Sequence, residues 1–175
     1  MDIINRINST RYLGREFLTW LWYRSALQSG IFEMPGGESG PLEVWFDAKI
    51  TLEAQGDVKE SNVIKAENPT ETSEAHAALL NGKLVSDARL RLVSGQKQWT
   101  LSVKADTLGI SGVKIPALLS REDDDQLYER FMLIEEIEDT VHALFQQFME
   151  LRMDDDAWRP EIQAIRGWVH GVSVA

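Results

Sequence analysis

The segment that most constrains the fold runs from Leu42 to Glu53, because apolar side chains occupy every second position in it. A period of two over this length is typical of an antiparallel strand with one face in a hydrophobic core and the other in solvent. A chain with such a strand has to supply neighbouring strands and a layer that covers the apolar face. The apolar positions are Leu42, Val44, Phe46, Ala48, Ile50 and Leu52.

The same period recurs in residues 83–93 and 97–105, and Gly95 between them predicts a hairpin turn. Weaker strands are predicted over 58–67 and around 113–115. We therefore expect an antiparallel sheet of four to five strands. The inward positions of the hairpin are Leu84, Ala88, Leu90, Leu92, Trp99, Leu101 and Val103.

A helix rich in aromatic residues is predicted before the sheet, over residues 11–29, with a cap among residues 8–10. Its apolar residues form one broad face, and Trp22 and Tyr23 extend that surface to flanks which a surface helix would keep polar. We expect this helix to be covered on more than one side, by the rest of the fold or by a partner.

The other helices are predicted around and after the sheet. A short helix should follow Asn68-Pro69 and end at Gly82 in a left-handed cap. A long helix should run from the acids at 122–125 to about Met153, since negative charge is favourable at a helix N-terminus. Three aspartates at 154–156 should break it and start a final helix, in which Pro160 is tolerable only near the first turn.

These elements predict an α+β fold: an antiparallel sheet, an N-terminal aromatic helix and a long acidic C-terminal helical hairpin. The chain has 175 residues, 43% of them apolar and 26% charged, as expected for a packed globular core. We expect a sheet domain over 1–120 and a helical segment over 121–175, packed on it or mediating association. Without cysteine, a signal peptide or a membrane span in the sequence, a soluble cytoplasmic protein is the expectation.

Charge is distributed unevenly along the chain. Residues 121–161 contain 14 of the 28 acids and only four bases, which accounts for a net charge of −10. Residues 83–114 instead contain six bases and two acids. Local fields decide where phosphate can approach, so the sheet is a candidate DNA-binding surface, although an ordinary charged surface is the alternative. The candidate DNA-binding residues are Lys49, Lys65, Lys83, Arg89, Arg91 and Lys104.

No catalytic template is matched by the residues. The glycine-rich segment at 36–40 lacks the lysine of a phosphate-binding loop, and the three histidines stand on separate predicted helices. The aspartate runs at 123–125 and 154–156 lack the spacing of a calcium loop and are explained by helix starts. We therefore expect no enzyme, no cofactor and no metal site.

The long C-terminal helix has apolar residues at steps of three and four, which resembles a heptad seam. Two interpretations remain open: the seam packs against the protein's own first helix or sheet, or it mediates self-association. The candidate association residues are Ile137, Val141, Leu144, Phe148 and Leu151.

Several short motifs resemble the family of recombination-associated protein RdgC, in its C-terminal half. Residues 16–21, Glu-Phe-Leu-Thr-Trp-Leu, are similar to the Leu-Thr-Glu-Trp type helix of that family. The likeness continues through Val63-Ile64-Lys65-Ala66, Gly82-Lys83-Leu84-Val85, the segment 99–106 and Lys114, and it covers roughly residues 15–116.

The resemblance implies a non-enzymatic protein that associates with duplex DNA without sequence preference and modulates recombination. Members of the family form a ring-like dimer around DNA, so a homodimer and a place on the nucleoid are implied as well. This chain has no counterpart of the family's N-terminal half. It also carries Glu67 and Asn68 where better-known members have a basic pair and a glutamine. The alternative is a protein-interaction module of the same ancestry that has lost DNA binding.

Overall fold

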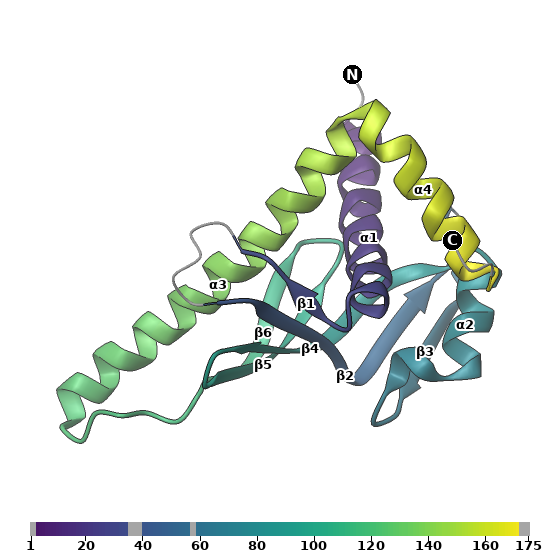
Figure 1. Ribbon diagram of the computed structural model, residues 1–175. Helices are drawn as coiled ribbons and strands as arrows, with labels where there is room; N and C mark the ends of the chain where they lie inside the picture. The colour runs from purple at the N-terminus through teal and green to yellow at the C-terminus, as the bar shows by residue number, and fades with distance from the viewer. Residues whose placement is uncertain (1–2, 35–39, 57–58, 172–175) are drawn as a thin grey trace.

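The alternating segment forms β2 (Leu42–Glu53), a long strand of a six-stranded antiparallel sheet. The computed structural model describes residues 3–34, 40–56 and 59–171. Figure 1 shows the sheet below and the long helices above it. The other strands are β1 (Ile31–Phe32), β3 (Ser61–Lys65), β4 (Leu84–Ser94), β5 (Lys97–Lys104) and β6 (Gly109–Lys114).

The strand order is β1-β2-β4-β5-β6, and β3 also pairs with β2. The two short strands share one edge of β2, where β1 pairs with its first residues and β3 with its last five. This arrangement confirms the predicted antiparallel sheet and both strands of the predicted hairpin. β1 was not predicted, because two residues are too short to show a period.

A β-bulge interrupts the alternation in β2. The pairing of β2 with β4 shifts between Phe46 and Ile50, and Ala48 adopts a φ of 57°. Ala48 is therefore exposed, whereas the strict alternation predicts it to point inward. Four steps along β2 match two along β4 in this stretch, so Ile50 opposes Ala88 at an inward position and is fully buried.

The aromatic helix α1 (Ile3–Leu27) packs across one face of the sheet, mainly on β4. Phe17, Trp20, Trp22 and Tyr23 are all buried, with the sheet on one side and the C-terminal helices on the other. This confirms that the helix is covered on more than one side, and the cover comes from the chain itself. The helix begins upstream of the predicted cap, since asparagine, serine and threonine cost only a few tenths of a kcal/mol inside a helix.

The remaining helices are a 3₁₀ turn and three α-helices. Pro69–Glu71 and α2 (Ser73–Leu80) replace the single short helix predicted there, and Gly82 follows with the predicted left-handed φ of 79°. The two long ones are α3 (Asp123–Met153) and α4 (Asp155–Val169). They meet above α1 in Figure 1.

The boundary between α3 and α4 is set by Asp154. Its Oδ1 accepts hydrogen bonds from the backbone N–H groups of Asp156 at 3.0 Å and Ala157 at 3.2 Å. This is the side-chain cap that the aspartate run predicts. Pro160 lies inside α4, beyond the first turn, so the expectation that it must be near the helix start is only approximately met.

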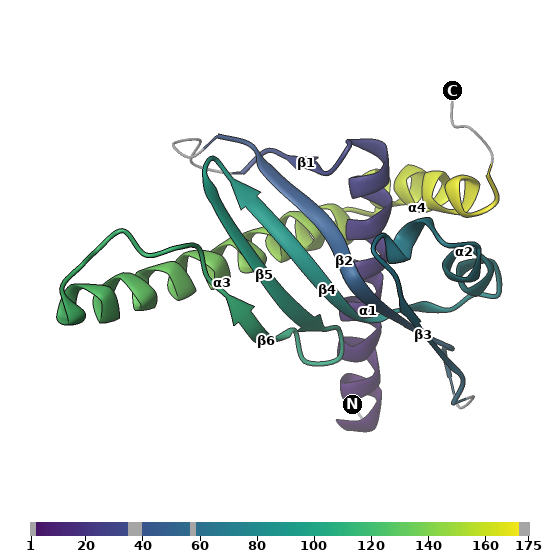
Figure 2. The ribbon, with the colours of Figure 1, turned by 90° about the horizontal axis from the view of Figure 1, so that it is seen from below.

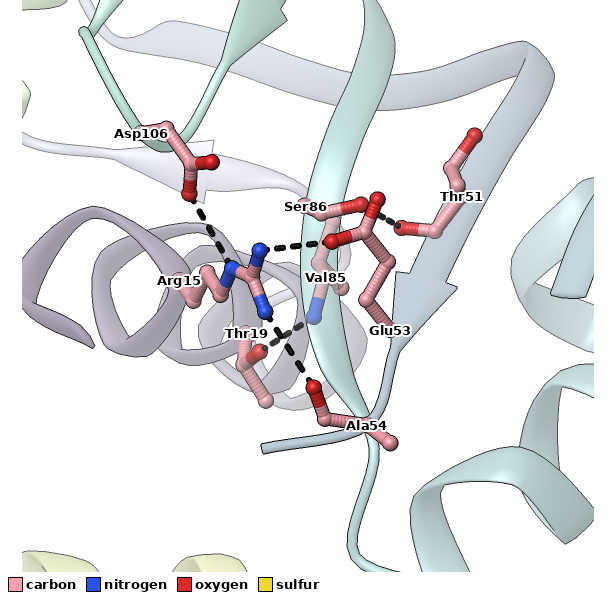
Figure 3. Close-up of polar contacts among 8 residues, drawn as sticks. All are labelled: Arg15, Thr19, Thr51, Glu53, Ala54, Val85, Ser86 and Asp106. Carbon is pink, nitrogen blue, oxygen red and sulfur yellow. Dashed lines mark hydrogen bonds and ion pairs between the residues drawn. The ribbon is translucent and has the colours of Figure 1, made fainter. Parts of the chain in front are cut away.

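Polar contacts fix α1 against the sheet at one place (Figure 3). Arg15, which is 8% exposed, donates to Glu53 Oε2 at 2.6 Å and to Asp106 Oδ1 at 3.1 Å. One turn later, the Thr19 hydroxyl accepts a hydrogen bond of 3.0 Å from the backbone N–H of Val85. A buried charge of this kind is stable only while its partners remain, so Arg15 ties the helix to the ends of β2 and β5.

Replacing Arg15 by methionine tests this tie. Arg15→Met should lower the free energy of unfolding by about 2 kcal/mol, because Glu53 and Asp106 lose their ion pairs with the guanidinium while retaining partial access to water. Urea denaturation followed by tryptophan fluorescence measures the change. The matched control is Arg130→Met at an exposed position of α3, where a loss within about 0.5 kcal/mol is expected.

One hydrophobic core joins the two predicted domains. It contains residues of α1 and the sheet together with Leu133, Ile137, Val141, Leu144 and Phe148 of α3 and Trp158 of α4. Helices α3 and α4 therefore pack on the sheet and α1 through shared core residues. No helix in the described part of the chain combines the length and apolar character needed to cross a membrane.

Candidate nucleic-acid interface

Five of the six predicted DNA-binding residues lie on the face of the sheet opposite α1, which we call the open face. Directly opposed residues of neighbouring strands project to the same face, and Lys49 opposes Lys65 in the pairing of β2 with β3. Arg91 lies between the buried Leu90 and Leu92, so its side chain points away from the core. Figure 2 looks onto this face, with the strands in front of α1 and α3. The five residues are Lys49, Lys65, Arg89, Arg91 and Lys104.

The arginines extend the positive charge across the sheet. Arg89 opposes Ser102 in β5, and its Nη1 lies 3.8 Å from where a Cβ of Gly112 in β6 would be. The guanidinium thus reaches over a small residue of β5 to the next strand. On the same face Arg91 opposes Thr100, which opposes Lys114 of β6, so a further cation continues the row.

Carboxylates neutralise only part of this charge. Asp87 opposes Lys104, and its Oδ1 lies 3.8 Å from Lys49 Nζ. Lys49 also faces Lys65 directly, and like charges at opposed positions of a sheet repel each other. An anion bound between these two lysines would relieve that repulsion.

The acidic C-terminal helices do not neutralise the open face. In the part of the chain that the structure describes, no ion pair joins α3 or α4 to an open-face cation. Their acids pair elsewhere: Glu136 Oε2 lies 2.8 Å from Lys97 Nζ, and Glu161 Oε1 lies 2.7 Å from Arg24 Nε. Lys97 opposes Ser94, and this pair lies two residues along the strands from the inward pair Leu92 and Trp99. The Lys97 side chain therefore lies on the helix side of the sheet.

Lys83, the sixth predicted residue, does not join the open face. It is 6% exposed, and its Nζ donates to Asn62 Oδ1 at 2.6 Å and lies 3.0 Å from Glu60 Oε1. It precedes β4, so the alternation of that strand does not fix its direction. Lys83 connects the start of β4 to β3, and its ammonium has no room for a phosphate.

The five predicted association residues do not form an exposed seam. Ile137, Val141, Leu144 and Phe148 are each at most 6% exposed, and Leu151 is half-buried against the same core. The buried stripe begins at Leu133, whereas the neighbouring Ile134 is 36% exposed. These side chains therefore pack against the protein's own elements, which is the first of the two interpretations.

Two open-face residues were missed by the sequence reasoning. Trp45 is 38% exposed, opposes Arg91 and donates from Nε1 to Glu43 Oε2 at 3.2 Å. Its place at an outward position of the alternating segment was the available signal. Lys114 was missed because β6 was predicted only as a short edge strand with no defined direction for its side chains.

Neither aspartate run gathers into a cluster of ligands. Asp123, Asp124 and Asp125 are exposed in the first turn of α3, while Asp154 caps α4. Over the described residues, no group of three or more histidine, aspartate or glutamate side chains is placed to hold a metal ion. Both runs form charged surface at the starts of helices.

Over the described residues, the open face is therefore a sheet surface on which lysine and arginine outnumber the carboxylates and Trp45 is exposed. It can attract phosphate groups, and it presents no element that would enter a groove to read bases. No protein-family model matches this chain, and no curated protein matches it either.

Proposed function

We propose that the protein is non-enzymatic and binds duplex DNA without sequence preference through the open face. The observation that carries this proposal is the gathering of Lys49, Lys65, Arg89, Arg91 and Lys104 on one uncovered side of an otherwise anionic molecule. A role in recombination and assembly as a dimer follow from the resemblance to the RdgC family and belong to the same proposal.

The dimensions of the open face suit a phosphate backbone. Strands lie about 4.8 Å apart, so the cations from β3 to β6 span roughly 19 Å of sheet. This width allows contacts to several phosphates, since each strand of duplex DNA carries one charge per ~3.4 Å of axis. Binding of this kind is driven by release of counterions and is therefore sensitive to salt.

A titration of labelled random-sequence duplex at several salt concentrations tests the proposal. With five phosphate contacts, log affinity should fall against log salt with a slope of roughly −4 to −5. Arg89→Glu combined with Arg91→Glu should weaken binding by about tenfold or more and reduce the slope by about 2. Fluorescence anisotropy between about 50 and 200 mM salt measures both quantities.

A matched control separates the open face from net charge. Arg121→Glu with Arg130→Glu changes the total charge by the same amount at exposed positions outside the sheet. This variant should retain most of the affinity. Equal losses in the two double variants, or no binding of the natural sequence at about 50 mM salt, would contradict the proposal.

A protein-interaction module is the second candidate. The aromatic helix and the heptad seam do not support it, because the aromatic side chains at 17, 20, 22 and 23 and the seam residues lie in the protein's own core. What favours it is a set of large apolar side chains that remain exposed in the first half of α3. If the protein binds no duplex DNA at low salt, the protein-interaction module becomes the favoured function.

A further inference from the structure

The first half of α3 extends beyond the sheet as an arm, defined as residues 123–135 (Figures 1 and 2). The first contacts that hold the helix to the sheet come at the end of this segment. Trp99 Nε1 donates to the carbonyl oxygen of Leu133 at 3.0 Å, and Lys97 pairs with Glu136. Residues before Leu133 thus project past β5 and β6 without the sheet beneath them.

The arm exposes an unusual amount of apolar surface. Leu127, Phe131 and Ile134 follow the spacing i, i+4, i+7 and form a stripe along one side of the helix. Contiguous exposed apolar residues on a soluble protein mark an interaction site more often than single ones do. The exposed fractions are Leu127 56%, Tyr128 68%, Phe131 63%, Met132 47% and Ile134 36%.

The segment that precedes α3 stiffens the arm and leaves the stripe uncovered. The Glu129 carboxylate accepts hydrogen bonds from the backbone N–H groups of Leu119 at 2.8 Å and Ser120 at 2.9 Å, which lower the pKa of Glu129. Glu129 is two residues from Leu127 and Phe131, so it points to the opposite side of the helix from the stripe. The stripe is therefore presented by an ordered helix, which reduces the entropy lost on binding.

Acidic side chains border the stripe. Asp124 is three residues before Leu127, and Glu138 is four residues after Ile134, which places both on the side of the helix that carries the stripe. Residues 121–139 contain nine acids and two bases, a net charge of −7. A partner that covers the stripe must bring positive charge to its edges.

This charge pattern disfavours a second copy of the same arm. In a parallel pair each acid would face its own counterpart. In an antiparallel pair centred on Phe131, Asp124 would face Glu138. Both orientations of self-pairing oppose carboxylates around the apolar centre, and like charges across a helix interface favour a different partner.

We propose that the arm is a docking site for a basic amphipathic helix of another protein. The partner would place apolar side chains against Leu127, Phe131 and Ile134 and lysine or arginine against the carboxylates that border them. This mode of recognition lays the apolar face of one helix on that of another. It is independent of DNA binding by the open face, which lies on the other side of the sheet from α3.

A synthetic helical peptide of about five turns tests this proposal with the full chain. The peptide carries leucine at i, i+4, i+7 and i+11 with lysine and arginine on its flanks, and a second peptide carries glutamate at the same flanks. Fluorescence anisotropy should detect the basic peptide at micromolar concentration and the acidic one at least about tenfold more weakly. Leu127→Ser with Phe131→Ser should lose at least about tenfold in affinity for the basic peptide.

A matched variant and a charge swap complete the test. Met153→Ser alters an exposed apolar residue at the far end of α3 and should bind as the natural sequence does. Glu135 is four residues after Phe131 and, like Glu138, lies on the stripe's side of the helix. Glu135→Lys with Glu138→Lys should therefore reverse the preference between the two peptides. Failure of the basic peptide to bind, equal binding of both peptides, or a stable dimer in sedimentation that Phe131→Ser dissociates would each overturn the proposal.

Discussion

Gly14→Ala is expected to lower the free energy of unfolding by about 3 kcal/mol, although alanine is the better helix former. A Cβ at residue 14 would lie 1.8 Å from the carbonyl oxygen of Ala105 and 2.6 Å from its carbonyl carbon. These atoms belong to the backbone directly after β5, and the Ala105 N–H donates to Ser86 O at 2.9 Å. Neither α1 nor the backbone after β5 can move away without breaking the contact between the helix and the sheet. The added methyl group therefore has to displace the helix.

The control uses the opposite substitution at an exposed position of the same helix. Ala26→Gly should cost about 1 kcal/mol from helix propensity alone, with no steric term. Urea denaturation followed by tryptophan fluorescence measures both variants. A Gly14→Ala protein as stable as the natural sequence would show that α1 does not approach Ala105 so closely.

Most of the sheet could be predicted from the sequence, because a period of two is a local signal. It defines β2, β4 and β5 and gives the direction of almost every side chain in them. The same signal predicts that Arg89, Arg91 and Lys104 share one face of the sheet. The period could not reveal the bulge at Ala48, because the register between β2 and β4 is decided by tertiary pairing.

The direction of Lys83 could not be predicted, and neither could the buried stripe of α3. Lys83 lies between a helix cap and the first residue of β4, where neither the helical nor the strand period applies. In α3 both Leu133 and Ile134 fit an apolar stripe, and only the position of the sheet decides that Leu133 is buried. The arm could not be predicted from the sequence for the same reason. Leu127 and Phe131 continue the apolar pattern of the buried part of α3, and only the structure shows that the sheet ends before them.

Phe148→Ala should lower the free energy of unfolding by about 4 kcal/mol. The Phe148 side chain is fully buried, and its ring centroid lies 5.7 Å from that of Phe17, 5.6 Å from that of Trp20 and 5.8 Å from that of Trp158. These rings come from α1, α3 and α4, so one truncation opens a cavity where three helices meet. The loss exceeds the transfer free energy of the ring because rigid helices cannot close around the gap.

Met153→Ala, at a position of α3 that is 77% exposed, should change stability by less than about 0.5 kcal/mol. Comparison of the two variants also tests whether the acidic helices belong to the cooperative fold. If they do, Phe148→Ala lowers the midpoint of a single transition observed by both fluorescence and circular dichroism. Two separate transitions, with the sheet unfolding at its original midpoint, would mean that α3 and α4 dock on a sheet domain that is stable without them. Because that docking covers Phe17 and Trp20, we expect one transition, since these rings would otherwise face water.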